Sequence, residues 1–138
     1  MSLPTIKILI AVALAGVGIV AFASQMIRMG RPDMKRDPDK LLRFHRWAGR
    51  LFMVLLVPLA FLGAKFWAAA GDSLSMRAGF HVVFALALLV VVLIKYLIVK
   101  AYRGFLRMAP TLGMTIFALT LLVFALSAVF AGLEYISR

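Results

Sequence analysis

Four long apolar stretches constrain this chain more than any other feature. They run over residues 4–27, 44–70, 76–99 and 108–136, and together they take up most of the 138 residues. An α-helix needs roughly 20 apolar residues to cross about 30 Å of hydrocarbon, so each stretch is long enough to span a bilayer. We therefore predict one all-α transmembrane domain over residues 1–138, an integral membrane up-down-up-down four-helix bundle.

The composition excludes several kinds of site. The chain has no cysteine, which rules out disulfides, thiolate metal sites, iron–sulfur clusters and covalent c-type haem. A net charge of +11 would indicate nucleic acid in a soluble protein. Here the basic residues lie where helices leave the membrane, so they indicate orientation and contact with anionic lipid, with no nucleic-acid partner.

The Lys and Arg residues are distributed unequally between the two faces. Residues 28–43 together with Arg46 and Arg50 carry eight of the sixteen, and residues 95–107 carry four more. The positive-inside rule places these connections in the cytoplasm and both termini on the outer side. We expect a multi-pass protein of a bacterial inner membrane, with the first stretch retained as a helix and not removed as a signal peptide.

Turn residues and small residues predict how the helices end and pack. Gly30, Pro32 and Pro38 interrupt the chain after the first helix, and a Gly71-Asp72-Ser73 turn, with Ser73 or Ser75 as helix cap, makes helices two and three antiparallel neighbours. Pro110 fits a first helical turn, and Pro58 should kink helix two. The small residues Ala11, Ala15 and Gly18 should let another helix approach the first one closely.

Only two histidines are present, and both lie in apolar stretches near a membrane face. His45 lies in Arg43-Phe44-His45-Arg46-Trp47-Ala48-Gly49-Arg50, and His81 follows Arg77-Ala78-Gly79-Phe80. Ionisable groups are costly to bury in a membrane, and neutral imidazole is a common ligand of haem iron. Structural histidines at the interface remain the alternative.

These two segments resemble the small four-helix b-type cytochromes of the cytochrome b561 and ferric-reductase-like group. The resemblance covers helices two and three. It implies non-covalent haem b and electron transfer along or across the membrane, with a quinone as a second candidate cofactor. It makes His45 and His81 axial metal ligands, and the implied propionate partners are Arg43, Arg46, Arg50, Lys65 and Arg77.

The two histidines cannot bind one haem within one chain. His45 lies 26 residues before Gly71 and His81 six after Ser75, which separates them by roughly 30 Å in depth at 1.5 Å per residue. Three alternatives follow: other ligands of this chain complete two separate sites, only one histidine binds haem, or a partner subunit or second copy supplies the missing imidazole. Candidates at matching depth are Lys65 for His81, and Met26, Met108 and Met114 for His45. The alternative explanation for these methionines is packing in the apolar bundle. The alternative for Lys65 is that its side chain extends toward the headgroups.

Other chemistry has little support. Glu134 is the only carboxylate in an apolar stretch, so no acid–base pair is expected and no catalytic residue is assigned. Lys95 and Lys100, with Tyr96 and Tyr102, fit an ordinary interfacial belt. Two hypotheses follow. The chain is either a haem b electron-transfer subunit between a quinone pool and a redox partner protein, or a cofactor-free scaffold subunit of a larger membrane complex.

Overall fold

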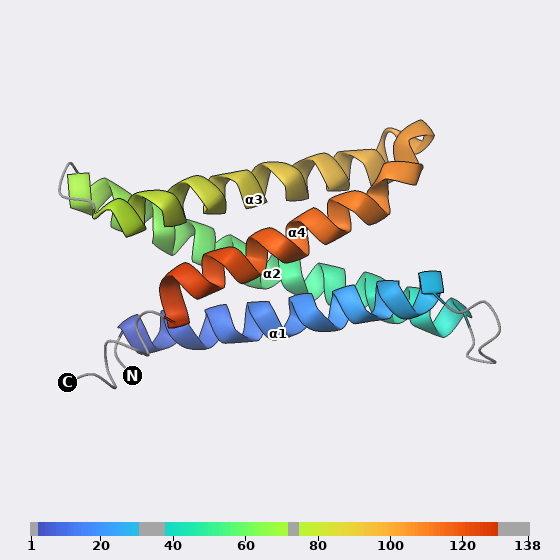
Figure 1. Cartoon of the computed structure of the whole chain (residues 1–138), viewed down its shortest axis with the longest axis horizontal. Helices are drawn as coiled ribbons and strands as arrows, with labels where there is room; N and C mark the ends of the chain where they lie inside the picture. The colour runs from blue at the N-terminus through green and yellow to red at the C-terminus, as the bar shows by residue number, and fades with distance from the viewer. Residues whose placement is uncertain (1–2, 31–37, 72–74, 130–138) are drawn as a thin grey trace.

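The computed structural model describes residues 3–30, 38–71 and 75–129. These residues are almost entirely helical and contain no strand. The helices are α1 (Leu3–Gly30), α2 (Pro38–Ala70), α3 (Met76–Lys100) and α4 (Ala109–Phe124), with a short 3-10 helix η2 (Arg103–Met108) before α4 and a π-helical turn η3 (Ala125–Val129) after it. The four long helices lie side by side and alternate in direction (Figure 1). The predicted all-α four-helix bundle is confirmed.

Two helix boundaries differ from those predicted. α2 begins at Pro38, six residues before the predicted start at 44. Proline is suited to a first helical position, because the N–H that it lacks would have no partner within the helix there. The carboxylate of Asp39 in the first turn interacts favourably with the helix dipole. α2 then continues as one helix through Pro58. At the other end of the chain, residues 130–136 of the predicted fourth helix lie outside the described residues.

The turn chemistry follows the sequence where it is described. Gly71 ends α2 with φ of +51°, a left-handed conformation that glycine adopts without a Cβ clash. Ser75 caps α3, because its side chain accepts a hydrogen bond from the Ala78 N–H at 3.3 Å. Pro110 lies in the first turn of α4 as predicted. Asp72, Ser73 and Pro32 lie outside the described residues.

The helices do not all pack on their neighbours in the chain. α1 packs along α2, α3 packs along α4, and α1 also contacts α4. α2 and α3 run antiparallel but have few contacts, and they diverge away from the end at which residues 71–75 join them (Figure 1). The predicted antiparallel course of α2 and α3 is confirmed, but the two helices are in contact over only a short part of their length. The contacts that α1 and α4 make with each other take the place of an α2–α3 interface.

Small residues on α1 allow this close packing. Ala15 is buried, and Gly18 lies against both neighbouring helices. A Cβ on Gly18 would lie 3.6 Å from the Phe52 ring and 3.8 Å from the Thr120 methyl group. The prediction that this stripe of α1 lets a helix approach is consistent with that packing. The buried apolar core near the middle of the bundle consists of Leu14, Phe52, Leu56, Leu88 and Val92.

An apolar groove remains between α2 and α3 because these helices diverge. Its volume is about 390 Å³. The residues lining it are Met53, Leu56, Val57, Leu89, Val92, Leu93 and Tyr96. The inner wall of the groove includes Leu56 and Val92, so the groove reaches the core of the bundle.

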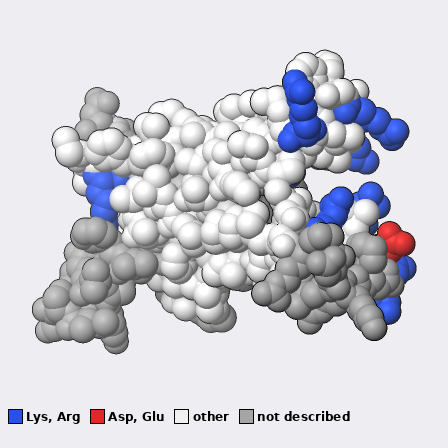
Figure 2. Space-filling model, turned by 45° about the vertical axis from the view of Figure 1, so that its right-hand side comes forward, with Lys and Arg blue, Asp and Glu red and all other residues white. Residues whose placement is uncertain are grey.

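The bundle is a multi-pass membrane protein with strongly unequal ends. All four long helices are long and apolar enough to cross a membrane. We call the end formed by the last turns of α1 and α3 and the first turns of α2 and α4 the His45 end, and the opposite end the His81 end. Lys and Arg side chains gather at the His45 end (Figure 2). The described acidic side chain there is Asp39.

Candidate functional site

Each histidine occupies a different end of the bundle. His45 lies seven residues after the start of α2, and His81 lies five residues after the start of α3. α2 and α3 run antiparallel (Figure 1). Residues near the starts of these two helices therefore lie at opposite ends of the bundle. The apolar core lies between them. A single cofactor therefore cannot be shared by the two histidines of one chain.

His45 is held by α1 through hydrogen bonds. Its Nδ1 lies 3.0 Å from the Ala21 carbonyl oxygen and 3.2 Å from the Ser24 Oγ. The Ser24 hydroxyl donates to the same Ala21 carbonyl at 2.8 Å, which leaves its oxygen as an acceptor for the ring. Ser24 is only 5% exposed, so this arrangement lies inside the α1–α2 contact.

These contacts determine where the ring proton is. A carbonyl oxygen can only accept, so Nδ1 must carry the hydrogen. In the neutral ring, Nε2 then has a lone pair, and no described residue forms a hydrogen bond with it. A histidine whose Nδ1–H donates to a backbone carbonyl, with Nε2 left free, has the arrangement typical of metal-ligating histidines. Ser24 and Ala21 were not identified from the sequence.

Lys95 of α3 and Gly113 of α4 lie at about the same depth in the bundle as Ser24 and His45. Lys95 lies five residues before the end of α3, and Gly113 lies four residues after the start of α4. The Lys95 Nζ is 2.9 Å from the position that a Cβ on Gly113 would occupy. Lys95 is half-buried, and its charge and that of Arg28 both act on the His45 ring. All four helices therefore contribute to this level.

Lys95 was expected in an interfacial belt, and its position corrects that expectation. The side chain lies against the backbone of α4 inside the α3–α4 contact, whereas Lys100, one turn further on, is exposed. Among the described residues, Lys95 makes no hydrogen bond and no ion pair. The number of residues between a lysine and the helix end does not show whether its side chain faces the lipid or the bundle interior. That depends on how α3 is rotated about its axis.

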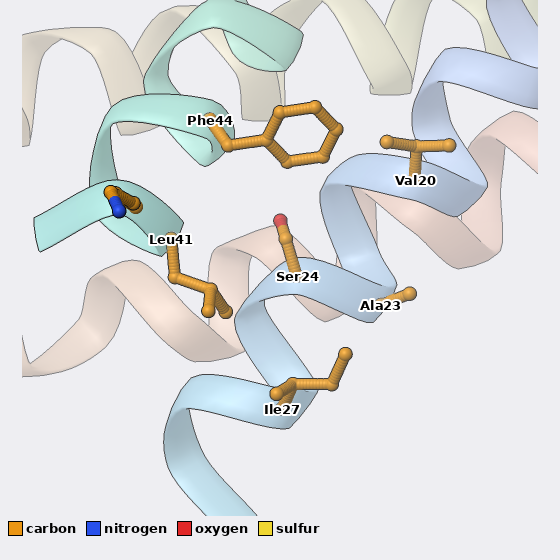
Figure 3. A pocket seen from close by; sticks show the side chains of 7 residues that line it. Val20, Ala23, Ser24, Ile27, Leu41 and Phe44 are labelled. Atoms are coloured by element: carbon orange, nitrogen blue, oxygen red, sulfur yellow. The ribbon is translucent and has the colours of Figure 1, made fainter. Parts of the chain in front are cut away.

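A pocket of about 470 Å³ adjoins the His45 anchor between α1 and α2. Its walls are almost wholly apolar, and the Ser24 side chain points into the space between Leu41, Phe44 and Val20 (Figure 3). The complete lining is Val20, Ala23, Ser24, Ile27, Lys40, Leu41 and Phe44. This end of the bundle can therefore take an apolar group next to a polar anchor.

The three predicted propionate partners on α2 are on its exposed surface. Arg43, Arg46 and Arg50 are all exposed, and the Arg50 guanidinium lies 5.6 Å from the centre of the Trp47 ring. The cations that act on the His45 ring are instead Lys95 and Arg28. The roles of the three arginines stay predictions.

The predicted methionine ligands of His45 lie at its end of the bundle. Met26 is half-buried in the last turns of α1. Met108 and Met114 are 47% and 41% exposed. Within residues 3–30, 38–71 and 75–129, no group of three or more His, Asp or Glu side chains could hold a metal ion. A ligand set made only of such side chains is therefore not present in this part of the chain.

His81 faces α4 near the start of its π-helical turn. The ring lies beside the Val123 carbonyl, and its Nδ1 is buried without a hydrogen-bond partner among the described residues. Ser127 donates to the Val123 carbonyl at 3.0 Å. π-helical turns occur frequently at functional sites because they free backbone groups from the helix ladder. No sequence pattern indicated this turn.

The two cations predicted near His81 are on the surface of the bundle. Lys65 is exposed, and its Nζ lies 4.9 Å from the centre of the Phe61 ring, one turn nearer the middle of α2. It does not extend toward the end of the helix, as a headgroup contact would require. No hydrogen bond joins Lys65 to His81.

Arg77 is exposed at the start of α3. Glu134 lies outside the described residues.

The fold and these two histidine environments define an all-α multi-pass membrane protein with an interior polar site near one end. The chain belongs to the family of unknown function DUF6529, whose sequence model matches residues 1–134. No curated protein and no solved structure matches the chain.

Proposed function

We propose that this protein is a membrane haem b electron-transfer subunit that links a quinone pool to a redox partner protein. The observation that supports it best is the His45 anchor, in which the Nδ1–H donates to the Ala21 carbonyl and Nε2 remains free to bind iron. The bound iron would supply the one-electron redox change. A site in the membrane interior also suits a cofactor held without covalent bonds.

The chain would contribute three things to such a site. Ser24 and Ala21 fix the orientation of the imidazole through their hydrogen bonds. Leu41 and Phe44 provide apolar walls beside it, which exclude water. Lys95 and Arg28 provide positive charge near the ring, which favours an anionic group there.

The histidines of one chain do not complete the donor set, because the sequence has two histidines and they occupy opposite ends. The second axial ligand therefore comes from another membrane subunit or a second copy, or from a methionine such as Met26. We further propose that the His45 end faces the cytoplasm of a bacterial inner membrane, because it carries most of the Lys and Arg residues (Figure 2).

The test is a reduced-minus-oxidised absorption spectrum of the purified protein, with haem quantified per chain after extraction into pyridine. Wild-type protein should show a b-type α-band. His45→Ala should lose the haem of the His45 end, and His81→Ala should lose any haem of the His81 end. A matched control is Thr115→Ala, since Thr115 is exposed and bonds only to the Thr111 carbonyl of its own helix.

A second candidate function is a cofactor-free scaffold subunit of a larger membrane complex. It is favoured by the single histidine at each end, which leaves no second imidazole for either site. Protein purified with its native partners would then show no haem spectrum, and His45→Ala would leave the composition of the complex unchanged.

A further inference from the structure

Lys95 is a cation inside a membrane-spanning helix that the haem proposal does not by itself require. It is half-buried, and among the described residues no carboxylate or hydrogen-bond acceptor pairs with it. Charged side chains within membrane helices are costly, and those that persist face the bundle interior and pair with another group. A partner for this ammonium is therefore expected.

The surrounding residues make room for the ammonium. The Nζ would lie only 2.9 Å from a Cβ on residue 113, and that residue is glycine. No Cβ contact closer than 3.0 Å is tolerated without movement, so any larger residue at 113 would displace the ammonium. The absence of a side chain on α4 at this position thus leaves the space that the Lys95 head group occupies.

The chain has few acids with which to neutralise this charge. It has 16 Lys and Arg residues against five Asp and Glu. The described acid at this end, Asp39, lies in the first turn of α2, six residues before His45. Arg28 adds a second positive charge near the same level. The local balance favours an anion from outside the chain.

We propose that Lys95 binds an anionic oxygen, a carboxylate or a phosphate, that a ligand places inside the His45 end. The oxygen has two possible sources. One is a haem propionate, and in that form the inference rests on the proposed function. The other is the phosphate of an anionic phospholipid bound at this end of the bundle, and this form stands without haem.

Two pairs of probes separate these sources, applied to the full-length protein in detergent. The first pair is haemin and its dimethyl ester, in which both propionates are esterified, followed by the Soret band on protein produced without haem. The second pair is phosphatidylglycerol and the diacylglycerol with the same acyl chains, followed by native mass spectrometry. The second member of each pair lacks the anionic oxygens of the first, so the comparison isolates the ion pair.

Two variants test Lys95 in different ways. Lys95→Met removes the charge, and Gly113→Ala keeps the charge but displaces the ammonium. The controls are Lys100→Met, which removes an exposed charge from the same helix, and Gly63→Ala, since a Cβ there meets nothing within 4 Å. Circular dichroism and size-exclusion chromatography confirm that each variant is folded.

We expect Lys95→Met and Gly113→Ala to weaken one anionic probe about tenfold or more, because a charge-assisted hydrogen bond is lost. The neutral member of that pair should bind as before. Loss confined to haemin identifies a propionate, and loss confined to phosphatidylglycerol identifies a lipid phosphate. Equal affinities of Lys95→Met and Lys100→Met for both anionic probes would overturn the inference.

If the haem proposal fails, the results with haemin differ from those expected above. Haemin would then produce no Soret shift that depends on His45, as His45→Ala would show. The phosphatidylglycerol comparison alone would in that case decide the role of Lys95.

Discussion

The aromatic rings of Phe22 and Phe117 stack face to face, with centroids 4.2 Å apart and planes 7° apart. Phe22 belongs to α1 and Phe117 to α4, so the stack joins the two helix pairs of the bundle. Phe22 follows Ala21, whose carbonyl orients His45. The contact therefore holds α4 beside the part of α1 that carries the candidate site.

A double-mutant cycle measures this contact. Phe22→Leu, Phe117→Leu and the double variant should show a coupling of about 1 kcal/mol in the free energy of unfolding, the usual size for an aromatic pair. Unfolding in mixed detergent micelles provides the measurement. The control is Phe61→Leu, an exposed phenylalanine of α2. Additive effects of the two substitutions would mean that the stacking contributes nothing beyond its contact area.

Gly18 should tolerate alanine but not leucine. A Cβ at this position makes ordinary contacts of 3.6 Å with Phe52 and 3.8 Å with Thr120, whereas the further carbons of leucine would overlap them. Gly18→Leu should destabilise the fold by about 1–3 kcal/mol, as overpacking generally does. Gly16→Leu is the matched control, because Gly16 is exposed with nothing within 4 Å. Equal melting temperatures for the two leucine variants would contradict the packing of α1.

Ser24→Ala should loosen the His45 ring without removing it. The variant loses the 3.2 Å contact to Nδ1 and keeps the Ala21 carbonyl. Loss of such a supporting group typically lowers metal affinity 10–100-fold, so we expect haem affinity to fall about tenfold. A haem titration followed by absorption measures this affinity. Ser127→Ala should bind haem at the His45 end like wild type, and a similar fall in both variants would exclude a specific role for Ser24.

Ser75→Ala should weaken the start of α3. The variant removes the side-chain acceptor of the Ala78 N–H, and such helix caps contribute about 1 kcal/mol. We expect a lower melting temperature and faster hydrogen exchange in the first turn of α3, measured by mass spectrometry. Thr115→Ala, which loses only a bond to the carbonyl of Thr111 in its own helix, should leave that turn unchanged.

The sequence predicted the helices well because membrane spanning depends on length and hydropathy alone. It narrowed the cap of α3 to Ser73 or Ser75 and predicted the place of Pro110, because these depend on local chemistry. It could not predict which helices pair. The long helices are apolar around most of their circumference, so no polar face shows which side meets a neighbour.

Only part of the candidate site could be predicted from the sequence. His45 stood out because an imidazole in an apolar stretch is rare, but its anchor Ser24 did not, since a single serine is ordinary there. A depth comparison could have found it, because Ser24 lies six residues before the end of α1 and His45 seven after the start of α2. The interior position of Lys95 could not be predicted, because it depends on the rotation of α3 about its axis and no local sequence pattern shows that rotation.

The divergence of α2 from α3 gives the core of the bundle an opening toward the surrounding acyl chains. A molecule dissolved in the bilayer can reach Leu56 and Val92 sideways, through a groove of about 390 Å³, without crossing either headgroup layer. Occupancy of that groove is then governed by how strongly a compound partitions into lipid, and not by its concentration in water. Long-chain hydrophobic molecules should therefore act on this protein at aqueous concentrations far below those that a water-facing pocket would need.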